Sequence, residues 1–430
     1  MNAELINTGT ELMLGLVVNT HHAWLARTLG DTGYRITRQT AVADSAAAIS
    51  QVVREALTRA EFVIVTGGLG PTSDDITRDE IAKLIQRPLR EDPAILRDIE
   101  QFFNGRGRPM PRAARVQAAA PEGAIVFPNA FGTAPGLAME IRPGLFRANP
   151  GWLILLPGPP RELRPMVINQ MIPLLREKFP PEPLCVRTLK STGIGESIVE
   201  ERIALPLKKC VEAGLEIGYC ARPGEVDVRL AATGPDAARL VDRAEEIVRK
   251  ILGHSIYTTG AERIEDTVVR LLAQQKRTLA MAESCTGGHI ANRITDVPGA
   301  SAVFLGGFVT YSNAAKQSFL GVRQETLEAY GAVSEATAKE MCEGARRRSG
   351  ADFALATTGI AGPSGGTPEK PLGTVYVAMA GPEGTVAEHR VNPFDRETFK
   401  HVTSQQALDL LRRVLSEETK NPQADRTCGC

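Results

Sequence analysis

Short apolar runs alternate with longer amphipathic stretches along most of the chain. The short runs have the length of β-strands, and the stretches between them carry apolar residues at helical spacing. This alternation is typical of α/β units with largely parallel sheets. Three runs in the first third end just before turn residues: Leu5–Thr8 before Gly9, Phe62–Val65 before Gly67, and Trp152–Leu156 before Gly158. Loops after parallel strands gather at one sheet edge, so we expect these turns to converge and form a phosphate-binding crevice.

The pattern changes near residue 180, which predicts a domain boundary. The proline-rich segment 180–183 has the composition of a linker, and the alternating residues 227–232 predict a strand of a smaller α+β unit. A second full-sized α/β domain then opens with a helix around residues 264–274. Its strands are expected near residues 277, 303, 353 and 374. We predict domains at residues 1–178, 179–256 and 257–416, followed by a flexible tail at 417–430.

The segment 277–288 is the most informative motif of the last domain. Its apolar run breaks into Ser284, Cys285 and Thr286 and then two glycines, after which helical spacing resumes. This predicts a strand, a tight turn and a helix start, where backbone N–H groups can stabilise an anion. An acyl-transfer enzyme would place its nucleophile on such a turn. The alternative interpretation is that Ser284 or Thr286 only caps the helix and that the glycines ease the turn.

A serine nucleophile needs a base, and the histidines of the last domain stand in no obvious partner motif. A desolvated lysine, relayed by a tyrosine, is a common substitute. Tyr311 and Lys316 are candidates of this type, the alternative being a strand-end aromatic and a solvated helix lysine. A glycine-rich loop at residues 357–366 follows the strand near residue 353 and could cradle a phosphate or a nicotinamide-type ring.

The first domain carries its chemistry in the segment 66–77. Glycines there allow the backbone to approach a phosphate, while Asp74 and Asp75 could hold the divalent cation that screens a diphosphate. The alternative is that one of the two aspartates is the N-cap of the following helix. Glu11 would face the same crevice, unless it is a solvated carboxylate at a helix start. His21 lacks a metal-ligand partner nearby, so we expect an ordinary surface or core side chain.

Composition favours a multidomain protein that acts on small molecules. The 430 residues exceed what one core usually supports, and 50 Lys+Arg balance 50 Asp+Glu. No global field therefore attracts nucleic acid or an anionic membrane. There is no apolar run of membrane-spanning length and no signal-like N-terminus, so we expect a cytoplasmic protein. Seven cysteines, widely spaced except for Cys428 and Cys430, suit reduced thiols better than a disulfide framework.

A series of motifs stands in order along the chain: Gly9-Thr-Glu, Thr66-Gly-Gly-Leu-Gly-Pro-Thr-Ser-Asp-Asp, Leu156-Pro-Gly-Pro-Pro, Ala282-Glu-Ser-Cys-Thr-Gly-Gly and Thr358-Gly-Ile-Ala-Gly-Pro. Between Ile6 and about Leu411 the chain resembles the competence/damage-inducible CinA family. The resemblance implies an N-terminal three-layer α/β domain similar to molybdopterin-binding proteins and a small α+β KH-like domain. It also implies a C-terminal α/β nicotinamide-nucleotide amidohydrolase domain.

The resemblance further implies two activities. The last domain would convert nicotinamide mononucleotide to nicotinic acid mononucleotide plus ammonia without a cofactor, and the first would hydrolyse ADP-ribose to AMP and ribose 5-phosphate with a divalent metal such as Mg²⁺. The implied catalytic residues are Ser284, Tyr311, Lys316 and Thr358. The substrate-binding candidates are Glu283, Thr286, Gly287, Gly288, Gly359, Gly362, Arg396 and Lys400 in the last domain and Gly67, Gly68, Gly70, Thr77 and Gly158 in the first. Asp74 and Asp75 are the metal-ligand candidates. A homodimer is also implied.

Two other hypotheses stay open at this point. In one, the first domain is a nucleotide- or molybdopterin-binding module without turnover. In the other, the protein is a DNA-associated factor that acts through its middle domain. A KH module clamps nucleic acid with a Gly-x-x-Gly loop. The middle segment offers Gly193-Ile-Gly195 without such a loop and without a basic excess, so we expect no strong nucleic-acid binding.

Overall fold

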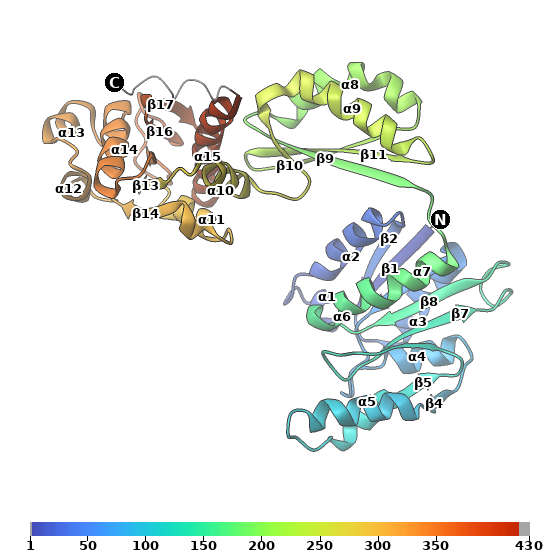
Figure 1. Ribbon diagram of the computed structural model, residues 1–430. Helices are drawn as coiled ribbons and strands as arrows, with labels where there is room; N and C mark the ends of the chain where they lie inside the picture. Colours follow the sequence, from blue (N-terminus) through green and yellow to red (C-terminus); the bar gives the residue numbers. More distant parts are fainter. Residues whose placement is uncertain (1, 421–430) are drawn as a thin grey trace. The chain divides into compact units, whose positions relative to one another are not determined.

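The computed structural model describes residues 2–420 (Figure 1). The chain forms two compact units, one ending at Leu184 and one beginning at Cys185. The last helix, α15 (Arg396–Lys420), continues four residues into the segment expected as a flexible tail. The rest of that segment lies outside the described residues. None of the described helices combines the length and the apolar character needed to cross a membrane.

The first unit is built on a six-stranded sheet in the order β2-β1-β3-β8-β7-β6. The strands are β1 (Asn2–Thr8), β2 (Arg35–Val42), β3 (Phe62–Thr66), β6 (Ile125–Phe127), β7 (Gly136–Ile141) and β8 (Gly151–Leu156). The first four in the sheet order run parallel, whereas β7 and β6 are antiparallel. A separate pair joins β4 (Leu89–Glu91) to β5 (Ala119–Pro121). The sheet is therefore mixed, not wholly parallel.

Helices cover both faces of this sheet and complete a three-layer domain. Because side chains alternate along a strand, neighbouring residues of β3 pack into different cores. Ile64 belongs to the cluster with Leu25 and Leu175, and Val63 belongs to the cluster with Val53. The helices are α1 (Thr10–Met13), α2 (Thr20–Asp31), α3 (Ala46–Arg59), α4 (Thr77–Leu84), α5 (Pro93–Asn104), α6 (Pro160–Met166) and α7 (Ile172–Lys178).

The predicted convergence of three turns is confirmed. β1, β3 and β8 are neighbours and run parallel, so the loops after Thr8, Thr66 and Leu156 leave the sheet at the same edge. The N–H of Gly67 donates to the carbonyl of Leu156 at 3.0 Å, which ties two of the loops together. The three turns of the first unit thus meet at one edge of the sheet.

The second unit opens with a four-stranded sheet in the order β10-β11-β9-β12. Its strands are β9 (Leu184–Thr192), β10 (Glu216–Arg222), β11 (Glu225–Thr233) and β12 (Ile256–Thr259), and helices α8 (Glu196–Glu212) and α9 (Ala237–Leu252) lie side by side on one face (Figure 1). Pro223 and Gly224 form the two-residue turn between β10 and β11, where Gly224 takes a φ of +81°. A proline followed by a glycine with this φ is the composition of a type II turn.

The last domain contains a five-stranded sheet in the order β14-β13-β15-β16-β17. The strands are β13 (Leu279–Glu283), β14 (Phe304–Val309), β15 (Phe353–Gly359), β16 (Thr374–Gly381) and β17 (Gly384–Val391). The four strands predicted from apolar runs are present, and β17 was not predicted. Since β14, β13 and β15 are parallel, the residues that follow them gather at one edge.

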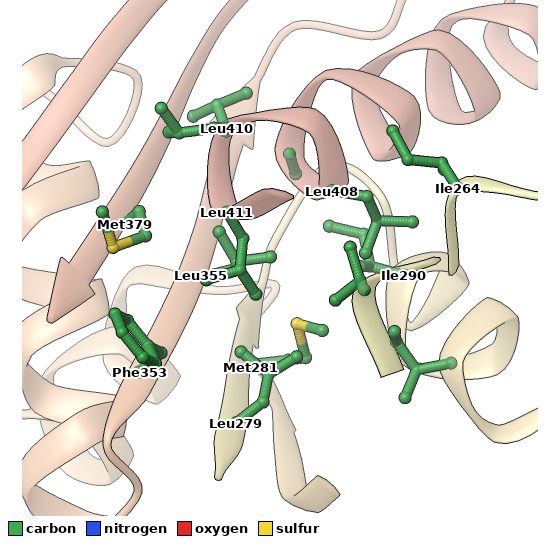
Figure 2. Close-up of a cluster of buried hydrophobic side chains, with 14 of the residues drawn as sticks. Ile264, Leu279, Met281, Ile290, Phe353, Leu355, Met379, Leu408, Leu410 and Leu411 are labelled. Carbon is green, nitrogen blue, oxygen red and sulfur yellow. The ribbon is translucent and has the colours of Figure 1, made fainter. Parts of the chain in front are cut away.

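Helices cover both faces of this sheet as well. The helices are α10 (Ile264–Gln275), α11 (His289–Thr295), α12 (Asn313–Ala315), α13 (Gln324–Tyr330), α14 (Glu335–Ser349) and α15. Figure 2 shows the larger core, where Met281 and Leu355 from the sheet meet Ile290 of α11 and Leu411 of α15. Smaller residues, among them Ala280, pack against α14 on the other face. Cys285, in the short connection between β13 and α11, belongs to the larger core.

Candidate active sites

The turn between β13 and α11 holds Ser284 at the sheet edge. The N–H of Ser284 donates to the carbonyl of Thr357 at 3.0 Å, and the N–H of Gly287 donates back to the carbonyl of Ser284 at 3.1 Å. Gly287 and Gly288 have φ values of +61° and +91°, which side chains with a Cβ rarely adopt. The two glycines therefore permit the sharp reversal that begins the helix.

Glu283, not Ser284 or Thr286, caps helix α11. Its carboxylate accepts hydrogen bonds from the N–H groups of Gly288, Ile290 and Ala291 at 3.0, 3.1 and 2.8 Å. The capping interpretation of Ser284 is therefore wrong. The buried carboxylate thus serves the helix start, and a contact of Glu283 with substrate stays a prediction.

The hydrogen bonds within the turn determine which backbone N–H groups remain available to an oxyanion. The N–H of Gly287 and that of Gly288 are both occupied within the turn. Within residues 2–420, those of Cys285 and Thr286 have no hydrogen-bond partner. The hydroxyl of Thr286 is buried and lies 2.7 Å from that of Thr357, and Thr286 is not among the residues that line the cavity, so its contact with substrate stays a prediction.

Lys316 lies at the start of a π-helical turn (Lys316–Leu320) and points at Ser284. Its Nζ lies 3.0 Å from Ser284 Oγ, 2.8 Å from the carbonyl oxygen of Thr310 and 3.5 Å from that of Tyr311. Only 1% of the residue is exposed, so the solvated-lysine interpretation is wrong. Burial lowers the pKa of Lys316, because the charged form loses its hydration.

A neutral lysine fits these contacts well. Its two hydrogens can be donated to the carbonyls of Thr310 and Tyr311, which leaves the nitrogen lone pair to accept the Ser284 O–H. No carboxylate contacts the amine within the described residues. The pair therefore has the geometry of a nucleophile with its base.

Tyr311 and Thr358 have different partners from those expected. The phenol of Tyr311 is 62% exposed and accepts a hydrogen bond from Arg396 at 2.6 Å, so it is directed to Arg396 and not to Lys316. The hydroxyl of Thr358 donates to the carbonyl of Ala332 at 2.7 Å. Both residues nevertheless line one cavity of about 230 Å³ with Ser284. Its other walls are Cys285, Asn313, Lys316, Ala332, Val333, Gly359, Ala361 and Arg396.

Arg396 and Lys400 supply positive charge from the first turns of α15. Arg396 donates to the Gly362 carbonyl at 2.9 Å and lies at the cavity wall. Lys400 is outside this wall, with its Nζ 3.9 Å from the point where a Cβ would stand on Gly287. Gly362 supports Arg396 through its carbonyl and does not itself line the cavity.

Asn313 was not predicted as a site residue, and Cys285 was named in the turn motif without an assigned role. Asn313 lies within the Tyr311–Lys316 motif, whose spacing was the available signal. Cys285 follows the nucleophile candidate directly and is buried. Burial raises the pKa of the Cys285 thiol to about 12, so this sulfur is not a thiolate near neutral pH.

The first unit holds a larger cavity of about 640 Å³ where its three turns converge. Gly67, Gly68, Gly70 and Gly158 line it, as do Glu11, Asp74 and Asp75. Thr77 does not. Its hydroxyl lies 3.2 Å from that of Thr8, and a Cβ on Gly68 would come within 2.0 Å of it, so Thr77 supports the loop. Its contact with substrate stays a prediction. His21, Asp44, Gln117 and Glu162 also line the cavity and were missed.

Neither Asp74 nor Asp75 caps α4. The N-cap of this helix is Ile76, which has no capping side chain. Both carboxylates instead take hydrogen bonds from Thr72, whose hydroxyl lies 2.5 Å from Asp75 Oδ2 and also contacts Asp74. The hydrogen bond from Thr72 lowers the pKa of Asp74, which keeps this carboxyl ionised.

The donors of this cavity suit a hard cation only when a ligand completes the site. Within residues 2–420, no cluster of three His, Cys, Asp or Glu side chains could hold a metal. Mg²⁺, however, is usually bound by one or two carboxylates together with water and substrate phosphates. Gln117 also lines this cavity, and among the described residues its buried Oε1 has no hydrogen-bond partner. Paired carboxylates and an unpartnered amide oxygen fit a Mg²⁺–diphosphate ligand.

Comparisons with known proteins divide the chain in the same order. The family model of a probable molybdopterin binding domain matches residues 4–177. That of the damage-inducible protein CinA KH domain matches residues 186–258, and that of the CinA C-terminal domain matches residues 261–415.

Whole-chain relatives agree with these matches. A CinA-like protein of Akkermansia muciniphila is 47% identical over 409 residues, which are 95% of this chain and 96% of that protein. A putative competence-damage inducible protein of Symbiobacterium thermophilum is 44% identical, covering 96% of this chain and 99% of its own. The solved competence/damage inducible protein CihA from Agrobacterium tumefaciens is 41% identical over 36% of this chain and 97% of its own, with a TM-score of 0.34. The chain belongs to the CinA family of competence/damage-inducible proteins.

Proposed function

We propose that the last domain hydrolyses the carboxamide of nicotinamide mononucleotide to nicotinic acid mononucleotide and ammonia. The observation that supports this most is the 3.0 Å contact between Ser284 Oγ and the buried Lys316 Nζ. A lysine with a lowered pKa can act as a base near neutral pH, as nucleophilic catalysis by serine requires. The cavity in front of the pair is small enough to select a ring-sized group.

The reaction proceeds in two halves. Ser284 Oγ attacks the amide carbon while Lys316 takes its proton, and the negative oxygen meets the N–H groups of Cys285 and Thr286. Collapse of this intermediate breaks the C–N bond, and Lys316 returns the proton to the leaving ammonia. A water molecule then attacks the acyl-serine, with Lys316 again as base, and releases the carboxylate and free Ser284. Arg396 stands at the cavity wall, where its positive charge suits the substrate phosphate.

Product analysis after incubation with nicotinamide mononucleotide tests this proposal. We expect Ser284→Ala to reduce ammonia release to background, with the melting temperature little changed, because removing a nucleophile costs several orders of magnitude in turnover. Cys285→Ala is the adjacent control and should keep most activity, since its thiol stays protonated. Substantial deamidation by folded Ser284→Ala would refute the serine mechanism.

For the first domain we propose metal-dependent hydrolysis of ADP-ribose. The 640 Å³ cavity with its glycine turns, paired aspartates and unpartnered Gln117 oxygen supports this. Asp74 and Asp75 would hold the cation, which when bound would screen the diphosphate charge. The glycine turns would supply backbone donors, and Asp74 is kept ionised by Thr72.

Asp75→Asn tests this second activity. We expect this variant to lose AMP formation from ADP-ribose plus Mg²⁺. The control is Asp98→Asn, at an exposed position on α5, which should leave AMP formation unchanged. If wild-type protein binds ADP-ribose without forming AMP, the first domain is a binding module. If Asp75→Asn hydrolyses at the wild-type rate, Asp74 becomes the better candidate ligand.

A further inference from the structure

A network of buried and half-buried polar side chains joins the middle domain to the helices beside Ser284. It starts at Glu225, the first residue after the Pro223-Gly224 turn. Glu225 Oε1 accepts hydrogen bonds from the Tyr257 hydroxyl at 2.7 Å and from Gln405 Nε2 at 2.8 Å. Gln405 belongs to α15 and is fully buried. The middle domain thus contacts the helix that carries Arg396 and Lys400.

The network of hydrogen bonds continues from Gln405 to helix α11. Arg293 of this helix donates to Gln405 Oε1 at 2.7 Å, to Glu265 Oε2 at 2.7 Å and to Ser404 Oγ at 2.6 Å. Arg293 is only 7% exposed, so each of these acceptors compensates for lost hydration. Helices α10, α11 and α15 are thereby fixed to one another by a single guanidinium.

Chemistry alone determines which way the Gln405 amide faces. A carboxylate at Glu225 can only accept a hydrogen bond from the amide, and a guanidinium at Arg293 can only donate one. Gln405 must therefore turn its NH₂ to Glu225 and its oxygen to Arg293. If Glu225 were removed, Arg293 would still require the oxygen of Gln405, but the buried NH₂ group would lose its acceptor and α15 would lose its hydrogen bond to the hairpin.

The hairpin that carries Glu225 is itself held firmly. The hydroxyl of Thr192 donates to the carbonyl of Gly224 at 2.8 Å, and that of Ser191 donates to the carbonyl of Val226 at 2.7 Å. Burial raises the pKa of Tyr257, so its hydroxyl remains a donor to Glu225. The turn also packs on α15, since a Cβ on Gly224 would lie 3.4 Å from Gln405 Cγ.

We propose that Glu225 is a positioning residue for the deamidase site, and that the middle domain thereby sets the affinity of the last domain for an anionic substrate. This rests on the proposed deamidase function. Ser284 and Lys316 are held by the sheet edge and by Glu283, so they do not depend on Glu225. Arg396 and Lys400 lie one to three turns before Gln405 on α15, and their placement does depend on it.

Steady-state kinetics with nicotinamide mononucleotide test the proposal on the full-length chain. The variants are Glu225→Ala, the conservative Glu225→Gln, and Glu201→Ala as a control at an exposed acidic position on α8. We expect Glu225→Ala to raise KM about tenfold with kcat within about twofold. Glu225→Gln should stay close to wild type, because its amide oxygen can still accept from Gln405, and Glu201→Ala should be unchanged.

Product binding separates this proposal from the deamidase function. Calorimetric titration of nicotinic acid mononucleotide should show about tenfold weaker binding by Glu225→Ala than by wild type. An unchanged KM and affinity in folded Glu225→Ala would overturn the positioning role while leaving the deamidase function intact. A fall in kcat and melting temperature with unchanged KM would show a purely structural role and would also overturn it. Absence of ammonia release by the wild type would instead refute the proposed function.

Discussion

Lys316 is the residue on which the proposed chemistry depends most, and its charge state makes a testable prediction. Because burial lowers its pKa, the rate should rise with pH as the amine loses its proton, and this rise should occur below the pKa of a free lysine. Lys316→Arg would place a permanently charged group beside Ser284. We expect it to lower kcat/KM about 100- to 10,000-fold and to abolish the rising limb of the pH profile. Retention of that limb would assign it to another group.

The same lysine should affect stability in a definite direction. Between its native pKa and the higher value in the unfolded chain, the unfolded state binds more protons, so the free energy of unfolding should increase with pH across that interval. Lys316→Met retains a long apolar side chain and has no charge to bury. We expect urea denaturation at pH 7 to show a free energy of unfolding equal to or above wild type, with a weaker pH dependence. Marked destabilisation of Lys316→Met would mean that the hydrogen bonds of the amine with Thr310 and Ser284 stabilise the fold by more than the burial of the amine costs.

At the scale of elements, helix α11 depends on a carboxylate that precedes it in the chain. Glu283→Gln keeps the side-chain shape but replaces one acceptor oxygen by an NH₂ group, which would face backbone N–H donors. We expect a loss of about 1–3 kcal/mol in the free energy of unfolding of the second unit, measured by urea denaturation. Turnover should fall as well, because Ser284 follows directly.

A matched change elsewhere separates capping from general loss of charge. Glu335→Gln alters an exposed carboxylate in the first turn of α14, whose one ion pair among the described residues is with Lys339. This variant should stay within about 0.5 kcal/mol of wild type. If Glu283→Gln and Glu335→Gln lower the free energy of unfolding equally, the three hydrogen bonds of Glu283 do not account for the loss of stability.

The elements also show how far sequence reasoning reaches. Apolar runs ending in glycines located the strand ends that line both cavities, because a strand pattern and a turn signal are local. The Glu283 cap was not predicted, since it lies five residues before Gly288, outside the usual spacing of capping residues. The antiparallel β16 carries the same kind of apolar run as the parallel strands, so its direction was not readable, and β17 has no such run and was not predicted.

For the whole molecule, the two proposed sites should be separable by mutation. Each lies within its own compact unit and is built from residues of that unit alone. We expect Asp75→Asn to remove ADP-ribose hydrolysis while deamidation stays within about twofold of wild type, and Ser284→Ala to do the reverse. Measuring both products in one reaction mixture checks this. Loss of both activities in a folded single variant would reveal coupling between the units.

Contacts between side chains that lie far apart in the sequence could not be predicted, for a physical reason. Ser284 and Lys316 were both named from their motifs, but their contact follows from the adjacency of β13 and β14. Arg293 and Gln405 are 112 residues apart and belong to no recognisable motif. Which polar groups meet in a core is decided by the packing of whole elements, not by local pattern.

The buried sulfur beside the nucleophile has a consequence for how this protein can be labelled. Alkylating reagents attack thiolates, and burial holds the pKa of Cys285 at about 12. The exposed Cys220, on the β10 strand of the middle domain, should therefore take up a maleimide dye first among the described cysteines. A fluorophore could then report on the hairpin beside Glu225 while the serine turn stays chemically untouched, and mild oxidants should spare that turn for the same reason.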